Sequence, residues 1–265
     1  MIKLCLAGAA GHVGRELTRA IADSQDLALA SAVGRSHAGE SLKDVGGEAR
    51  ADVRIHASVA EALQAGPAEV FIDYTRPEVV KANVRVAIEA GCHAVIGTSG
   101  LTDADYAEID AWARHKGVGV FAAGNFSLTA ALMQYFSTVM ARHMPHWEIL
   151  DYASDAKPDA PSGTARELAM QLSRVAKPAW KVPVGETQGL KESRGATLNG
   201  SQMHSIRVPG YYSAIEAVFG DVGERIELRH ESTSYAPYVA GTLLAARKVG
   251  GFTGVKRGMG VLLGL

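Results

Sequence analysis

The sequence has few of the features that mark secreted, membrane-spanning or nucleic-acid-binding proteins. Its 265 residues include only two cysteines, Cys5 and Cys92, which is too few for a disulfide framework and typical of the reducing cytoplasm. The formal net charge is -1 at pH 7, so no overall field attracts nucleic acid or an anionic membrane. No apolar run reaches the roughly 20 residues that cross a bilayer, and the N-terminus lacks the basic start of a secretory signal. We therefore expect a cytoplasmic protein that binds neither nucleic acid nor membrane.

Residues at metal-ligand spacing are also scarce. His143 and His146 are close in sequence, but Pro145 lies between them and no cysteine or carboxylate is spaced to complete a site. We predict no metal site. What is present is an ordinary globular composition, 47% hydrophobic and 21% charged, on a chain long enough for one large domain or two modest ones.

The first 125 residues alternate between short apolar runs and helical patterns. Continuous apolar strands between amphipathic helices predict a parallel sheet that is covered on both faces. This doubly wound α/β architecture binds its ligands beyond the carboxyl ends of the strands. The expected strands are residues 2–7, 27–33, 70–74, 94–97 and 119–121, and the clearest helices are residues 13–22 and 103–114.

The pattern changes near Asn125. Segments with period-2 alternation and one polar face indicate an antiparallel or mixed sheet, and a late apolar helix is expected to dock back on the first domain. We predict a Rossmann domain from residues 1–125 and 237–265, and a second α/β domain with an open mixed sheet from residues 126–236. The second domain's expected helices are 128–142 and 163–175, and its strands 147–151, 205–208, 215–219 and 225–230.

A glycine-rich segment joins the first expected strand to the first expected helix. Glycines there permit a tight turn and the close approach of a pyrophosphate, and the helix N-terminus offers N–H groups and a positive dipole end. Glycines also occur in plain turns, but the position at the first strand–helix junction favours a dinucleotide site. The predicted cofactor residues are Gly8, Ala9, Ala10, Gly11, His12, Val13 and Gly14.

The residues after the second expected strand bear on which dinucleotide binds. NAD-binding domains carry an acid there, which accepts hydrogen bonds from the ribose 2′-hydroxyl. This chain has Gly34, Arg35 and Ser36 instead. A guanidinium suits a 2′-phosphate better than a diol, although a solvated surface arginine is the alternative interpretation. The missing acid favours NADPH, with NADH as the alternative cofactor.

Further polar segments lie at residues 73–78, 97–100 and 123–127, each after an expected strand, and at residues 157–165. In this order, after the glycine segment, they resemble the motifs D-F-T-R-P-E, G-T-T-G, N-F-S and K-x-D-A-P-S-G-T-A of the 4-hydroxy-tetrahydrodipicolinate reductases, also called dihydrodipicolinate reductases. The resemblance covers almost the whole chain. It implies an NAD(P)H-dependent oxidoreductase of lysine and diaminopimelate biosynthesis that transfers hydride to a cyclic imine or a related unsaturated carboxylate.

The last motif also has a physical interpretation of its own. Ser162 is a good N-cap residue, and the N–H groups of Gly163 and Thr164 form a ready carboxylate site with the Thr164 hydroxyl. Lys157 can pair with that anion or donate a proton. The alternative is a capped helix with a surface lysine. The resemblance favours substrate binding, and it implies that Lys157 assists protonation while the Ser-Gly-Thr turn holds a carboxylate.

Two more expectations follow from the resemblance. The second sheet packs against its copies in the family, so a homotetramer is implied. The nicotinamide end of the cofactor is implied to lie beside residues that follow two central strands, namely Gly97, Thr98 and Ser99 with Ala123, Gly124, Asn125 and Phe126.

The chain departs from the family pattern just before Lys157. Family members usually carry two adjacent histidines there, whereas this chain has Ala153 and Ser154, and neither supplies a proton near neutral pH as imidazole does. Ser154 is still expected to line the substrate pocket. Three interpretations remain open. Lys157, Tyr152 or water donates the proton; the substrate is a different imine or carbonyl compound outside lysine biosynthesis; or the chain binds NADPH without catalysis.

Overall fold

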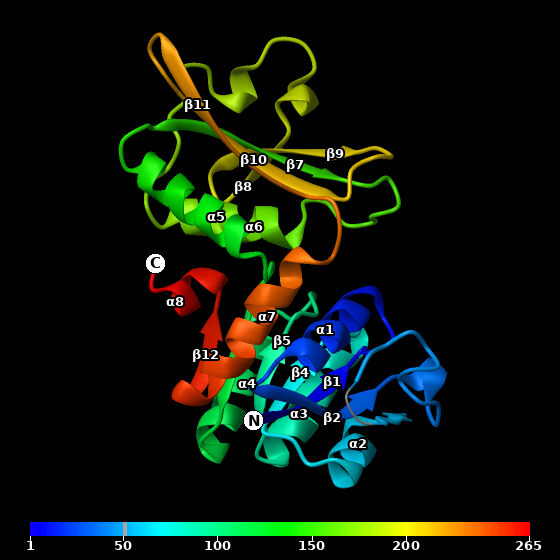
Figure 1. The fold of residues 1–265 in the computed structure, drawn as a ribbon. Helices are drawn as coiled ribbons and strands as arrows, with labels where there is room; N and C mark the ends of the chain where they lie inside the picture. The colour runs from blue at the N-terminus through cyan, green and yellow to red at the C-terminus, as the bar shows by residue number, and fades with distance from the viewer. Residues whose placement is uncertain (50–51) are drawn as a thin grey trace. The chain divides into compact units, whose positions relative to one another are not determined.

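The chain folds around two separate β-sheets (Figure 1). The computed structural model describes residues 1–49 and 52–265. One sheet belongs to a compact unit formed by Met1–Leu128 and Tyr235–Leu265, called unit 1, and the other to Thr129–Ser234, called unit 2. Within the described residues, no helix combines the length and the hydrophobicity that a membrane span requires.

The sheet of unit 1 is parallel throughout, with the strand order β12-β6-β5-β4-β1-β2-β3. Every residue of β4 and β6 is buried, as expected for strands covered on both faces. The strands are β1 (Ile2–Ala7), β2 (Leu27–Val33), β3 (Ile55–His56), β4 (Val70–Asp73), β5 (His93–Ile96), β6 (Gly119–Ala122) and β12 (Gly254–Arg257). The predicted doubly wound sheet is therefore confirmed.

The helices of unit 1 begin and end at residues with clear local reasons. A capping box between Thr102 and Asp105 opens α4, and Gly117 closes it in the left-handed conformation with φ 72°, which glycine adopts without strain. On α7, the Thr242 hydroxyl lies 2.6 Å from that of Tyr74. The helices are α1 (His12–Asp23), α2 (Val59–Ala65), α3 (Pro77–Glu89), α4 (Asp103–Lys116), α7 (Pro237–Lys248) and α8 (Met259–Leu263).

Five elements of unit 1 were not anticipated from the sequence: α2, α3, α8, β3 and β12. The last of these, Gly254–Arg257, extends the sheet by pairing with β6. It has no apolar run, and only its first residue is buried. Because its place depends on main-chain pairing with a distant strand, its own residues give no strand pattern.

The sheet of unit 2 has the order β11-β10-β7-β9-β8. The pair β7 and β9 is parallel and the other neighbours are antiparallel, so the predicted mixed sheet is confirmed. The strands are β7 (His146–Ala153), β8 (Ala196–Leu198), β9 (Ser201–Arg207), β10 (Ser213–Asp221) and β11 (Glu224–Ser232), and the helices are α5 (Leu128–Ala141) and α6 (Gly163–Ser173).

Alternation along β7 separates the two faces of this sheet. Trp147 and Ile149 belong to a core cluster with Leu168 and Leu172 of α6, and Figure 1 shows α5 and α6 on the same side of the sheet. The alternate residues of β7, such as Glu148 and Leu150, therefore point to the other face. We call this second side the open face of unit 2.

Candidate active site

The glycine segment forms the turn between β1 and α1. Gly8 has φ +82°, and a Cβ there would lie 2.1 Å from the Tyr74 carbonyl oxygen. A Cβ on Gly14 would lie 2.1 Å from the carbonyl oxygen of Gly8. Gly11 precedes α1 without a side-chain cap, so no capping side chain takes up the N–H groups of the first turn. This turn, with Ala9, Ala10, His12 and Val13, fits the pyrophosphate of a dinucleotide.

His12 is stacked on an aromatic ring that comes from far along the chain. Its imidazole and the Tyr235 ring have centroids 5.1 Å apart and planes 4° apart. Tyr235 is the residue at which the chain returns to unit 1. The sequence predicted His12 as a cofactor residue and gave no sign of Tyr235, because no local pattern relates positions so distant.

Arg35 lies in a short 3₁₀ helix, Arg35–His37, directly after β2. Its side chain is exposed. The N–H of Gly8 donates to the carbonyl oxygen of Val33 at 2.9 Å, so the glycine turn and the residues after β2 lie at the same edge of the sheet. A ligand on the glycine turn is therefore in the neighbourhood of Arg35.

A fully buried carboxylate organises the turns after β4 and β5. Asp73 Oδ1 accepts hydrogen bonds from the hydroxyls of Thr75 and Thr98, both at 2.6 Å, and from the Thr75 N–H at 3.0 Å. Its Oδ2 accepts one from Asn83 Nδ2 at 2.9 Å. Thr98 is thus held in place by Asp73, to which the sequence analysis assigned no role. The sequence signal for this structural role of Asp73 is an acidic residue at the end of an apolar strand.

Aromatic rings pack against the same turns. A Cβ on Gly97 would lie 2.2 Å from the Tyr74 ring, so glycine is required there. The Phe126 ring lies 5.9 Å from the rings of both Tyr74 and Phe121. Burial raises the pKa of Tyr74 far above its ordinary value, and its phenol therefore stays neutral.

The predicted nicotinamide residues divide into two kinds. Thr98, Asn125 and Phe126 are buried and shape the turns; the side-chain oxygen of Asn125, for example, accepts the Ser127 N–H at 2.8 Å. Ser99 and Gly124 are exposed, and Gly97 and Ala123 are half-buried, so these can contact a ligand directly. All of them follow β5 or β6, at the carboxyl edge of the sheet, where such folds bind their ligands.

In unit 2 the N-terminus of α6 is built as predicted. The Ser162 hydroxyl accepts the N–H of Ala165 at 3.2 Å, and the Ser162 N–H donates to Asp151 Oδ2 at 2.8 Å. The amides of Gly163 and Thr164 lie between these two. Thr164 is buried, and its carbonyl oxygen accepts a hydrogen bond from Gln134 of α5 at 3.3 Å.

Lys157 lies in the loop between β7 and α6. Its Nζ is 2.6 Å from Asp159 Oδ1. Burial of Asp159 opposes its ionisation, but the hydrogen bond and charge of Lys157 outweigh that effect and lower the pKa of the carboxyl. The Lys157 N–H donates to the Ser154 carbonyl oxygen at 3.0 Å. Ser154 and Lys157 therefore share one turn, while Ala153 is buried in β7.

Asp151 and Arg207 form an ion pair behind this loop, with Nη2 and Oδ2 2.7 Å apart. Neither residue was predicted from the sequence to have a role. Asp151 lies at the inward register of β7 that Trp147 and Ile149 also occupy, and only 1% of it is exposed. An acidic residue such as Asp151 at an inward-facing position of a strand is the sequence signal for a buried charge with a partner.

Tyr152 lies on the open face, opposite to Asp151. Its hydroxyl donates to Glu216 Oε2 at 3.1 Å, and the Arg229 guanidinium lies 4.6 Å from its ring centroid. Burial and the Glu216 carboxylate raise the pKa of Tyr152. Of the two side chains considered as proton donors, only Lys157 shares the loop that carries the predicted substrate residues.

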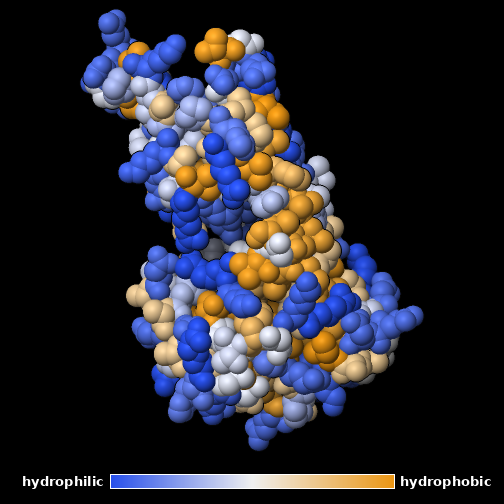
Figure 2. All heavy atoms as spheres, turned by 90° about the vertical axis from the view of Figure 1, so that its left-hand side faces the viewer, coloured by the Kyte–Doolittle hydropathy of each residue, from blue (hydrophilic) through white to orange (hydrophobic). Residues whose placement is uncertain are grey.

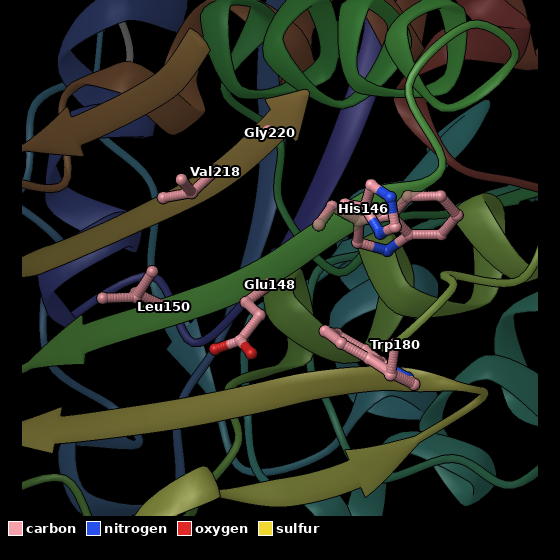
Figure 3. Close-up of a pocket in the computed structure, with 7 residues that line it drawn as sticks. His146, Glu148, Leu150, Trp180, Val218 and Gly220 are labelled. Atoms are coloured by element: carbon pink, nitrogen blue, oxygen red, sulfur yellow. The ribbon is translucent and has the colours of Figure 1, made fainter. Parts of the chain in front are cut away.

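A separate pocket of about 340 Å³ lies on the open face (Figure 3). Its lining includes no predicted site residue; Glu148 within it is held by Arg194 at 2.9 Å and His204 at 2.7 Å. The lining residues are His146, Trp147, Glu148, Leu150, Trp180, Val218 and Gly220. Among residues 1–49 and 52–265, no group of three or more His, Cys, Asp or Glu could hold a metal ion.

Comparisons with known proteins agree with this arrangement. Family models for the N-terminus and the C-terminus of dihydrodipicolinate reductase match residues 2–126 and 126–262. A 4-hydroxy-tetrahydrodipicolinate reductase of Moorella thermoacetica is 37% identical over 99% of this chain and 98% of its own length. One of Halalkalibacterium halodurans is 34% identical over 95% of each.

Solved structures show the same fold. A dipicolinate-bound dihydrodipicolinate reductase from Paenisporosarcina sp. TG-14 matches with a TM-score of 0.80 and 27% identity over 98% of each chain. These matches confirm the resemblance that the motifs indicated, and with it the reaction class, an NAD(P)H-dependent reductase of this type. The chain belongs to the dihydrodipicolinate reductase family.

Proposed function

We propose that this protein reduces 4-hydroxy-tetrahydrodipicolinate or a closely related cyclic imino acid, with NADPH as the hydride donor. The observation that carries the proposal is the loop of unit 2, where the capped turn of Ser162 and the Lys157–Asp159 pair both occur. The Paenisporosarcina relative of the same fold holds dipicolinate, a small aromatic dicarboxylate. The two buried free cysteines suit a cytoplasmic setting.

The glycine turn would hold the cofactor pyrophosphate, and Arg35 its 2′-phosphate. The exposed residues Ser99 and Gly124 would lie at the nicotinamide end, with Ser99 on a turn that Asp73 fixes through Thr98. When bound, NADPH supplies the hydride, and the protein contributes binding, orientation and the exclusion of water.

On the substrate side, the amides of Gly163 and Thr164 would bind one carboxylate at the positive end of α6. Lys157 would deliver the proton to the imine nitrogen. Asp159 holds the ammonium group of Lys157 near the loop. In this assignment Lys157 donates the proton in place of the family's missing histidines, and water is the alternative donor.

The decisive experiment follows NADPH consumption with the lysine-pathway intermediate 4-hydroxy-tetrahydrodipicolinate, which the preceding synthase of that pathway generates in situ. A panel of other cyclic imino acids is measured beside it. Turnover on the intermediate supports the proposal. Activity confined to another imino acid would show that the site around Ala153 and Ser154 has been adapted to a different substrate. NADPH binding without turnover on any compound would contradict the proposal and favour a binding protein.

We also propose a homotetramer assembled through the open face of unit 2. Leu150 and Val218 point to this face beside the pocket of Figure 3. Figure 2 shows hydrophobic areas between polar ones on one side of the molecule. On the open face itself Leu150 and Val218 are only half-buried, so apolar surface is available there.

Light scattering after size exclusion tests the assembly. Val218→Arg places an unpaired charge on the open face and should reduce the mass towards that of a monomer. Val261→Arg, at an exposed position of unit 1, is the matched control and should leave the mass unchanged. A wild-type monomer would contradict this proposal.

A further inference from the structure

The ion pair between Asp151 and Arg207 is unusually well buried. The side chains are 2% and 16% exposed. A buried ion pair contributes little net stability, since apolar residues of similar size often serve as well. One donor, Arg207 Nε, is also buried without a hydrogen-bond partner among the described residues, which costs stability. Stability alone therefore gives a weak reason for this pair.

The contacts of Asp151 point towards the predicted substrate turn. Its Oδ2 accepts the Ser162 N–H at 2.8 Å, the Ser205 hydroxyl at 3.2 Å and Arg207 Nη2 at 2.7 Å. Ser162 is the N-cap of α6. The carboxylate thus joins strands β7 and β9 to the first residue of the turn that would bind a substrate carboxylate.

The contacts of Arg207 lead to the other part of the site. Nη2 also donates to the Asp159 carbonyl oxygen at 2.9 Å, and Nη1 donates to the carbonyl oxygens of Asp151 and Ile206. The Asp159 side chain in turn pairs with Lys157. One guanidinium therefore fixes both the backbone beside Lys157 and the carboxylate behind Ser162.

Charge gives the pair a second effect. A buried carboxylate directly behind the α6 turn would repel an incoming substrate carboxylate, and the repulsion is strong where water is excluded. Arg207 neutralises Asp151 at hydrogen-bond distance. The turn can then use Asp151 as an anchor without losing its affinity for anions.

We propose that Asp151 and Arg207 are positioning residues of the substrate site. They hold Ser162–Thr164 and Lys157 in one arrangement and keep the α6 turn attractive to a carboxylate. This inference rests on the proposed function, and neither residue needs to touch the substrate.

The test measures dipicolinate binding by calorimetry, with KM and kcat, in Arg207→Met, Asp151→Asn and the double variant. We expect Arg207→Met to weaken dipicolinate binding and to raise KM by about tenfold or more, as in other removals of one partner from a buried pair. Adding Asp151→Asn to Arg207→Met should recover part of that affinity, because it removes the unpaired charge. A purely structural pair predicts that the unfolding temperature falls in Arg207→Met and partly recovers in the double variant, while dipicolinate affinity stays within twofold of the wild type in every folded variant.

Arg247→Met is the matched control, because Arg247 also pairs with an aspartate, Asp26, but in unit 1, whereas the α6 turn belongs to unit 2; its dipicolinate affinity should match the wild type. Dinucleotide affinity and the unfolding temperature report whether each variant is folded. If Arg207→Met does not fold, Arg207→Lys is the substitute, because lysine keeps the charge but lacks the planar guanidinium that binds two acceptors at once. It should show an intermediate loss of dipicolinate affinity.

Two results would count against the inference, and they differ from each other. Variants that are folded and bind dipicolinate within twofold of the wild type would overturn the positioning role alone. A wild-type protein that binds NADPH but neither binds dipicolinate nor reduces any imino acid would overturn the proposed function and the inference with it.

Discussion

The N-termini of α1 and α6 are capped in two different ways. Gly11 precedes α1 without a side-chain cap, so no capping side chain takes up the N–H groups of the first turn. The α6 turn is partly occupied by the protein itself, since Ser162 takes the Ala165 N–H and Asp151 takes that of Ser162. In the proposed function the first turn would hold a pyrophosphate and the second a single carboxylate, so we expect the α6 turn, with fewer free backbone N–H groups, to bind the smaller anionic group.

The two units also stabilise their turns in different ways. Asp73 of unit 1 is bound by two threonine hydroxyls and an asparagine amide, whereas Asp151 of unit 2 is bound by a guanidinium. Neutral donors suffice for Asp73. We infer that a full positive charge stands behind the α6 turn because, in the proposed function, that turn attracts an anion.

The largest expected effect concerns Lys157. Replacing it with Met should lower kcat about 10²–10⁴-fold, the usual contribution of a general acid, while NADPH binding stays unchanged. Steady-state kinetics with the pathway intermediate measures this, and Lys157→Arg is the matched variant that keeps the charge but cannot release its proton. A kcat within tenfold of the wild type in Lys157→Met would indicate that water is the donor.

Gly11→Ala tests the uncapped turn. The backbone conformation at Gly11 is extended, and an added Cβ would lie 3.1 Å from the Gly8 carbonyl oxygen. Alanine therefore needs only a small local shift, and its methyl group would stand where the pyrophosphate approaches. We expect dinucleotide affinity to fall about a hundredfold, because two or more hydrogen bonds to a charged group are lost. Fluorescence titration with NADPH measures this. Dipicolinate binding should stay the same, and a parallel loss there would mean that the fold was damaged.

Arg35→Ala sharpens the assignment of the cofactor. If the guanidinium binds the 2′-phosphate, affinity for NADPH should fall about tenfold or more, and affinity for NADH should not change. Titrations with both cofactors give this ratio directly. Equal effects on the two would show that Arg35 does not contact the 2′-phosphate.

The smallest effect is a pH dependence within unit 1. His93 Nδ1 accepts the Gly119 N–H at 2.8 Å, and burial lowers the pKa of His93 below its ordinary value of 6.5. The neutral ring makes this bond, so its contribution to stability is complete above pH 6.5 and is lost as the pH falls through the lowered pKa.

His93→Asn, whose side-chain oxygen can accept the same N–H without titrating, should lose less stability between pH 7.5 and 5.5. We expect a difference of about 0.5–1 kcal/mol in urea unfolding. Identical pH profiles for the two proteins would contradict this account.

Local rules in the sequence predicted much of the molecule. The glycine turn, the Ser162 cap and the alternation in β7 all depend on neighbouring residues, and the structure contains each of them. The contacts that complete the sites depend on tertiary structure instead. Tyr235 reaches His12, and Arg207 reaches Asp159, from distant parts of the chain. No periodicity or spacing could reveal those pairs.

Transfer of a label tests the central claim most directly. The protein would be incubated with NADPH deuterated at C4, in either stereochemical form, and with the pathway intermediate made in situ. Our account predicts that the reduced product gains one deuterium from one of the two forms. Tight NADPH binding with no deuterium in any product, from this intermediate or from other cyclic imino acids, would contradict it.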